Sequence, residues 1–75
     1  MEKEEIEFLR DRFKEIKSIL EEIKDFYNYD PEMPNENVPK DILKTLMGLR
    51  YAISNIVDRI SSLKLQIFIK QNQIN

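Results

Sequence analysis

The chain has 75 residues with a formal net charge of -2, and 35% of its residues are charged. A chain of this length forms one small domain at most, for which a single core is marginal. It contains no Cys and no His, which excludes disulfides, thiolate metal sites and the usual zinc, iron and copper ligand sets. The acidic start lacks a signal-peptide core, and no apolar run approaches the ~20 residues of a spanning helix. We therefore expect a cytoplasmic protein without a membrane partner.

The first predicted element is a helix over about residues 3–27. Apolar residues recur there at alternating spacings of three and four, the pattern of a helical packing seam. This first seam consists of Ile6, Leu9, Phe13, Ile16, Leu20, Ile23 and Tyr27. Glu2, Glu4 and Glu5 fall in the first turn, where the positive end of the helix dipole favours acids. The pattern predicts a helix with one packing face.

A proline-rich loop is predicted over about residues 28–38, because this stretch is dense in turn-forming residues. Five apolar or aromatic residues surround its prolines: Phe26, Tyr27, Tyr29, Met33 and Val38. Apolar side chains at helix ends generally pack down onto the core. We therefore expect the aromatic residues of this group to cover the loop end of the seam; the alternative is that residues 31–34, which match the pattern P-x-x-P, form a proline-rich ligand.

The second predicted helix covers about residues 39–70 and ends in a frayed polar tail, 71–75. Pro39 suits the first helical position, and Asp41 falls at the third position, near free backbone amides. An unbroken second seam runs through Ile42, Leu46, Leu49, Ile53, Ile56, Ile60, Leu63 and Ile67. Two seams separated by one loop predict an all-α, coiled-coil-like antiparallel hairpin that forms a single domain over residues 1–75.

The two predicted helices differ in length. At 1.5 Å per residue, the first spans ~38 Å and the second ~50 Å. If Tyr27 lies opposite Ile42, the chain after about Ile67 projects beyond the first helix. The overhang, residues 65–69, carries Leu65, Phe68 and Ile69 as a stripe turned away from the seam. Exposed patches of this kind usually mark an interface.

One side of the predicted hairpin is apolar or small on both helices. Ile19 and Phe26 flank the first seam at heptad position g, and Thr45 and Ala52 flank the second seam at the same position. In an antiparallel pair these positions lie on one side, here called the g flank. We expect it to face a second copy in a homodimeric four-helix bundle. The predicted oligomer or partner interface comprises Ile19, Phe26, Ala52, Leu65, Ile67, Phe68 and Ile69.

Charge divides unevenly along the chain. Residues 1–38 hold six bases and twelve acids, whereas residues 39–75 hold six bases and two acids. The division favours pairing of an acidic helix with a basic one. Six bases form the e flank, opposite the g flank: Lys3, Arg10, Lys17, Lys24, Arg50 and Lys64. They are candidates for anion or nucleic-acid contact; the alternative is solvated ion pairs with Glu7 and Glu21 on the same helix.

Catalysis would rest on sheltered carboxylates in a chain without His or Cys. Every Asp and Glu between Ile6 and Ile67 falls outside the seams, so we expect no enzyme, cofactor, metal or small-molecule substrate. We expect instead a self-assembling protein-interaction module, small regulator or scaffold. A nucleic-acid-binding hairpin dimer and a small subunit of a larger helical complex are the alternatives. In architecture the hairpin dimer resembles the plasmid copy-control RNA-binding hairpin proteins, without a motif match, and this resemblance implies RNA as the nucleic acid.

Overall fold

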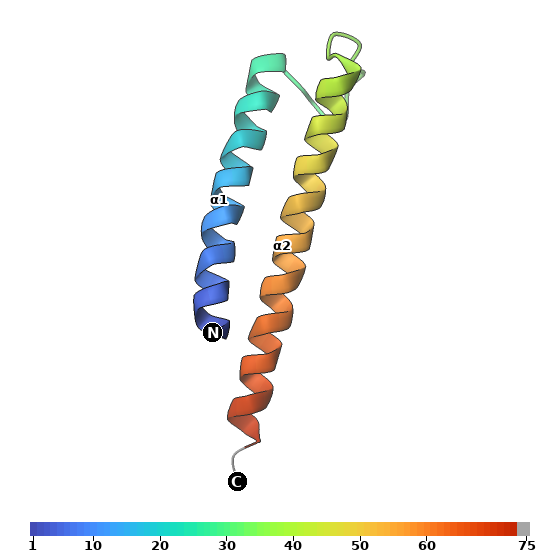
Figure 1. The fold of residues 1–75 in the computed structure, drawn as a ribbon. Helices are drawn as coiled ribbons and strands as arrows, with labels where there is room; N and C mark the ends of the chain where they lie inside the picture. Colours follow the sequence, from blue (N-terminus) through green and yellow to red (C-terminus); the bar gives the residue numbers. More distant parts are fainter. Residues whose placement is uncertain (74–75) are drawn as a thin grey trace.

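The computed structural model describes residues 1–73 and contains two long helices. They are α1 (Glu2–Tyr27, 26 residues) and α2 (Lys40–Asn72, 33 residues). The helices lie side by side and run in opposite directions, joined by the loop at one end of the molecule (Figure 1). The prediction of an all-α helical hairpin is confirmed. Figure 1 also shows that α2 continues past the beginning of α1.

The two predicted seams form the contact between the helices. Every seam residue is buried or half-buried. Leu46 and Leu63 are the most enclosed, with 2% and 1% of their surface exposed, and Ile6 and Leu20 are also buried. Each helix thus turns one apolar stripe toward the other, which is the packing expected of alternating three- and four-residue spacings.

The first helix ends at Tyr27 because the next residue leaves the helical region. Asn28 adopts a left-handed conformation, with φ 51° and ψ 41°, which Asn tolerates better than most residues. The N–H of Asn28 donates to the carbonyl of Asp25 at 3.3 Å, and the N–H of Tyr29 donates to that of Lys24 at 2.9 Å. These bonds satisfy carbonyls at the end of α1 that have no partner within the helix.

The start of α2 differs by one residue from the prediction. Pro39 is the capping residue before the helix and not its first residue, because its ψ of 146° is extended while its φ of -56° is helical. Its carbonyl accepts the first helical hydrogen bond, from the N–H of Leu43 at 3.0 Å. Proline suits this place because it has no N–H that would need a partner.

The second helix extends two residues further than predicted. Fraying was expected from residue 71, but α2 continues through Asn72. The side-chain amide of Asn72 donates to the carbonyl of Phe68 at 2.8 Å, and Lys70 forms an ion pair with Glu2 of α1. Both contacts hold the last turn in place. The predicted tail also included residues 74–75, which lie outside the described residues.

Two of the three aromatic residues expected at the loop end of the seam lie against it. Tyr27 and Tyr29 are half-buried, and Val38 beside them in the loop is buried. Phe26 is exposed, so the prediction was wrong for this residue, and Met33 is exposed as well. The ring of Phe26 meets only the edge of the Tyr27 ring, at 4.9 Å between centroids, because its heptad position places it beside the seam. Met33 lies in a polar turn.

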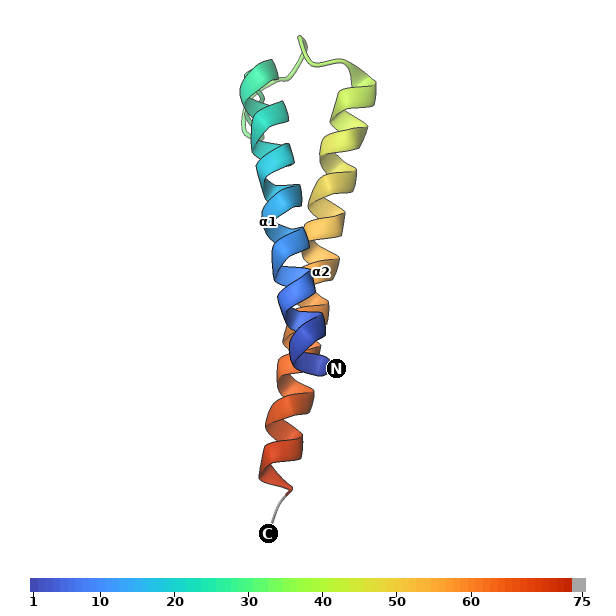
Figure 2. The same ribbon diagram turned by 60° about the vertical axis from the view of Figure 1, so that its left-hand side comes forward.

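The hairpin is a rod without a second layer. It measures 60 × 19 × 15 Å, with a radius of gyration of 16.9 Å. A compact chain of this length would have a radius of about 11 Å. Figure 2, turned by 60°, shows the helices inclined at a small angle and no other element against either of them. The outer faces of both helices in the described part of the chain therefore remain open.

Candidate interaction surfaces

Large apolar side chains remain exposed along the whole rod. They are Met1, Phe8, Ile19, Phe26, Met33, Met47, Tyr51, Val57, Leu65, Phe68 and Ile69. Single exposed apolar residues are normal, but continuous groups mark contact surfaces. Sequence reasoning had singled out five of these eleven residues as interface candidates. It missed others, such as Phe8, Met47 and Tyr51, because they occupy heptad positions outside both the seams and the two flanks.

The exposed area exceeds that of a compact protein of the same mass. The accessible surface of the chain is 6239 Å². A folded monomer of 9.1 kDa exposes about 4,900 Å², so the hairpin carries a surplus of about 1,300 Å². Each partner in a standard stable interface buries about 800 Å². The surplus is therefore large enough to form such an interface.

The g flank lies on one side of both helices, as the heptad positions predicted. Glu5 of α1 and Arg59 of α2, which also occupy position g, form an ion pair across the flank with a distance of 2.9 Å. Toward the loop, Phe26 is 79% exposed and Ile19 is 47% exposed, while Ala52 is half-buried. The flank is thus apolar in its loop half and charged in its other half.

Both bases at position g have an acidic partner. Arg12 forms an ion pair with Glu15 at 2.7 Å, and its guanidinium lies 5.2 Å from the centroid of the Phe8 ring. The hydrogen bonds from Arg59 lower the pKa of the Glu5 carboxyl, and the same contact raises the pKa of Arg59. The g flank is therefore close to neutral as well as partly apolar.

The structure brings together three of the six predicted e-flank bases. Lys3, Arg10 and Lys64 line one cavity of about 260 Å³, together with Ile6 and Glu7. The adjoining cavity, of about 270 Å³, is lined by Arg10, Phe13, Val57, Ile60, Ser61 and Lys64. Both volumes are below the ~300 Å³ at which small-molecule pockets begin. These hollows are grooves between side chains and hold no ligand-sized site.

The other three e-flank bases lie apart from this group. Lys24 forms an ion pair with Glu21 at 3.8 Å, as the alternative interpretation expected. Lys17 lies 5.9 Å from the centroid of the Phe13 ring. Arg50 lines a separate hollow of α2 with Met47 and Tyr51. The six bases therefore do not share one hollow.

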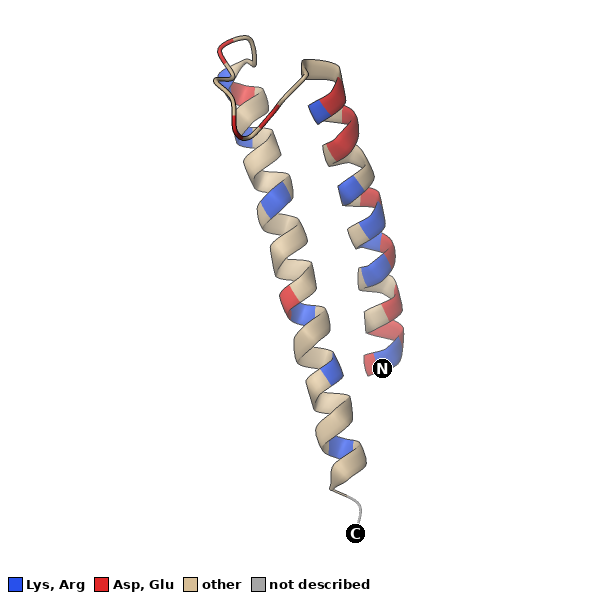
Figure 3. Ribbon diagram, turned by 180° about the vertical axis from the view of Figure 1, so that it is seen from behind, with Lys and Arg blue, Asp and Glu red and all other residues tan. Residues whose placement is uncertain are grey.

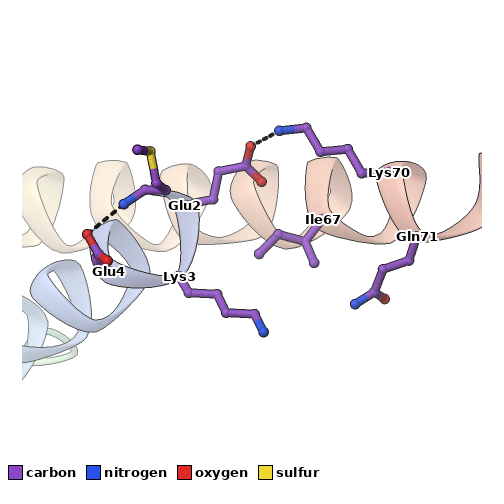
Figure 4. A pocket seen from close by; sticks show the side chains of 7 residues that line it. Glu2, Lys3, Glu4, Ile67, Lys70 and Gln71 are labelled. Carbon is purple, nitrogen blue, oxygen red and sulfur yellow. Dashed lines mark hydrogen bonds and ion pairs between the residues drawn. The ribbon is translucent and has the colours of Figure 1, made fainter.

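The overhang is covered on one side by the first turn of α1. Ile67 is half-buried and lines a cavity of about 410 Å³ with residues 1–4, Lys70 and Gln71. Figure 4 shows Glu2 and Lys70 joined by their ion pair beside Ile67. Ile67 thus lies beside the contact between α1 and α2 and is less exposed than the rest of the overhang. Leu65, Phe68 and Ile69 do remain exposed.

Residues 1–73 contain no group of three or more acidic side chains arranged to hold a metal ion. All buried side chains in this range are apolar. Neither α1 nor α2 has the length and apolar content needed to cross a membrane. Comparison with protein-family models, with curated proteins and with solved structures finds no match to this chain. The hairpin and its exposed surfaces are accordingly the basis for assigning a function.

Proposed function

We propose that the protein is a self-assembling, non-enzymatic interaction module that works as a homodimeric four-helix bundle. The observation that carries this proposal is the surplus of about 1,300 Å² of exposed surface on a rod two helices thick. As a bundle, the protein presents its remaining surfaces, including the overhang, to a protein partner. The role is that of a small scaffold or regulator.

Assembly is favoured because the single seam between α1 and α2 buries few apolar side chains completely. Among residues 1–73, only Ile6, Leu20, Val38, Leu46 and Leu63 are buried in the single chain. A four-helix bundle buries a wider stripe on each helix than a pair does. Pairing two hairpins would enclose apolar side chains that now meet solvent, at about 25 cal/mol for each Å² removed from water.

The experiment is sedimentation equilibrium combined with thermal unfolding followed by circular dichroism, each over a hundredfold range of protein concentration. A homodimer has twice the 9.1 kDa mass of the chain, and its Tm rises with concentration because association stabilises the folded state. A folded chain that stays monomeric, with a Tm independent of concentration, would contradict the proposal. A chain that is unfolded or polydisperse alone would instead favour the small-subunit alternative.

Nucleic-acid binding is the second candidate, supported by the cluster of Lys3, Arg10 and Lys64. Among residues 1–73, none of these three bases lies within ion-pair distance of an acid, and all three line the same cavity. Free bases of this kind are available to phosphates, with an affinity that falls as salt rises. The overall charge of -2 weighs against this candidate.

A gel-shift titration with single-stranded and hairpin RNA at several salt concentrations tests the second candidate. Binding through the cluster would be lost in an Arg10→Gln, Lys64→Gln double variant and retained in a Lys14→Gln, Lys40→Gln control, which removes the same charge elsewhere. The absence of any retardation at low salt would rule it out.

A further inference from the structure

We propose that two copies of this chain pair through their g flanks with the loops at opposite ends, so that each α2 lies antiparallel to the α2 of the second copy. This inference rests on the proposed homodimer and specifies its geometry. It follows from the charges of the two flanks, the composition of α2 and the length of α2 relative to α1.

Charge argues against pairing through the e flank. A two-fold interface places the same patch of each copy against the other. Of the six e-flank bases, only Lys24 is in an ion pair within the described residues. Pairing through this flank would bring the remaining bases of both copies together, Lys3, Arg10, Lys17, Arg50 and Lys64, and like charges brought together in an interface are unfavourable.

The g flank does not have this difficulty. Its bases Arg12 and Arg59 are already paired with Glu15 and Glu5, so bringing two such flanks together adds little repulsion. Ile19 and Phe26 supply exposed apolar surface on the same side. The g flank therefore combines the two properties that a self-complementary interface needs, near-neutral charge and apolar area.

The α2 helix is suited to the interior of an assembly. Figure 3 shows charged residues along the whole of α1, whereas α2 has long stretches without charge. One such stretch, residues 51–57, covers about two full turns. Five of these seven residues are apolar or aromatic, Tyr51, Ala52, Ile53, Ile56 and Val57, and a helix that is apolar on more than one side is typical of a buried position. On the side of the g flank, α2 also carries Gly48 and Ala52, and a Cβ added at Gly48 would meet nothing within 4 Å, so another helix has room to approach.

The lengths of the helices select the orientation. Because α2 has 33 residues and α1 has 26, only the first turn of α1 lies beside the overhang. With the loops at opposite ends, the overhang of each copy lies at the level of the loop end of the other copy, where Phe26 is exposed. Ile69 then approaches Thr45 and Gly48 of the second copy. With the loops at the same end, Phe26 and the overhang lie at opposite ends of the bundle, and neither covers the other.

The orientation can be tested by measuring the distance between two spin labels, one at the same residue of each copy in the dimer. Because the chain has no Cys, a single introduced Cys gives one label on each copy. Lys44→Cys and Asp58→Cys place labels on the same outward face of α2, near its start and near its centre. In the proposed dimer the Lys44 labels are about 36 Å apart along the bundle axis and the Asp58 labels about 6 Å. The labels are also separated across the bundle by on the order of 20 Å, the width of two helices. The measured Lys44 distance, about 41 Å, should therefore exceed the Asp58 distance, about 21 Å, by about 20 Å. Equal distances at the two sites would overturn the proposed orientation.

A pair of matched variants tests the flank. Ala52→Glu adds a carboxylate to the g flank, whereas Ser54→Glu adds one to the other side of the same helix. We expect Ala52→Glu to raise the dimer dissociation constant at least tenfold and Ser54→Glu to leave it within about twofold. If Ser54→Glu has the larger effect, the flank assignment is wrong although the protein still dimerises. If the labelled variants show no dipolar coupling and the unsubstituted protein shows no dimer mass, the proposed function itself fails.

Discussion

Arg59 of α2 donates two hydrogen bonds to the carboxylate of Glu5 of α1. Its Nε donates to Oε2 at 2.9 Å and its Nη2 donates to Oε1 at 3.3 Å. This two-pronged geometry is the preferred arrangement of an Arg–carboxylate pair. It connects residues 54 positions apart in the sequence and lies on the side of the hairpin where position g of both helices meets.

The pair makes stability depend on pH in a defined direction. Hydrogen bonding to Arg59 lowers the pKa of Glu5 in the folded protein below its ordinary value of 4.5. The carboxylate therefore stabilises the fold above that value, and this contribution is lost as the pH falls through the lowered pKa. We expect Glu5→Gln to lose less stability than the unsubstituted protein when the pH is reduced from about 6 to about 3.

Urea unfolding at a series of pH values measures this effect. Glu22→Gln is the matched control, since it removes a carboxylate from the same helix that forms no ion pair within residues 1–73. The control should follow the pH dependence of the unsubstituted protein. Identical pH dependence for Glu5→Gln and the unsubstituted protein would show that the pair does not form in solution.

The two most buried residues should dominate stability. Leu46 is 2% exposed and Leu63 is 1% exposed, so truncation to Ala leaves a cavity in the seam. We expect Leu46→Ala and Leu63→Ala each to lower the free energy of unfolding by about 2–5 kcal/mol. Met47→Ala, at an exposed position beside Leu46, should change it by about 0.5 kcal/mol or less. Chemical denaturation followed by circular dichroism makes the comparison, and a similar loss in all three variants would contradict the seam.

A substitution at Gly48 should affect the stability of the hairpin and the strength of dimerisation in opposite directions. Nothing lies within 4 Å of a Cβ added there, so Gly48→Ala should stabilise α2 in the single chain by about 1 kcal/mol. If the α2 of a second copy approaches this position, the same methyl group should weaken dimerisation. Thermal unfolding at low concentration and sedimentation at high concentration measure the two effects. Stronger dimerisation in Gly48→Ala would show that no helix packs closely at this position.

The overhang should contribute to association. Phe68 and Ile69 are exposed in the single hairpin, and a Phe68→Glu, Ile69→Glu variant adds two charges where we expect a partner surface. We expect the dissociation constant of the dimer to rise at least tenfold while helix content is retained. Ser54→Glu, Ser61→Glu adds the same charge to α2 outside the overhang and should have a smaller effect. Unchanged mass and unchanged protein partners in the first variant would exclude the overhang as an interface.

Sequence periodicity was sufficient for the fold because the main interaction repeats along the chain. Residues such as Leu46 and Leu63 recur at helical spacing, so one pattern determines the element, its buried face and its packing. The helix ends were predicted less well because they depend on single backbone angles. The ψ of Pro39 and the side-chain hydrogen bond of Asn72 have no periodic signal.

The candidate surfaces were only partly predictable because they depend on cross-helix register. The Glu5–Arg59 ion pair was missed, although both residues occupy position g and a search for opposite charges at facing positions would have found it. The grouping of Lys3, Arg10 and Lys64 and the separation of Arg50 from them required the packed structure. How far Ile67 is covered depends on where the first turn of α1 lies relative to α2.

The connectivity of the hairpin also has a consequence for the order in which it folds. Contacts beside the loop, between the end of α1 and the start of α2, close a short segment of chain, whereas the Glu5–Arg59 contact closes one of 54 residues. Closing a longer loop costs more entropy. We therefore expect the contacts of the seam to form first beside the loop and then progressively toward the overhang. Leu46→Ala should then slow folding, and Leu63→Ala should mainly speed unfolding. The end that carries the overhang is the last to form and the first to open, which makes it the part of the hairpin that a partner can most readily order.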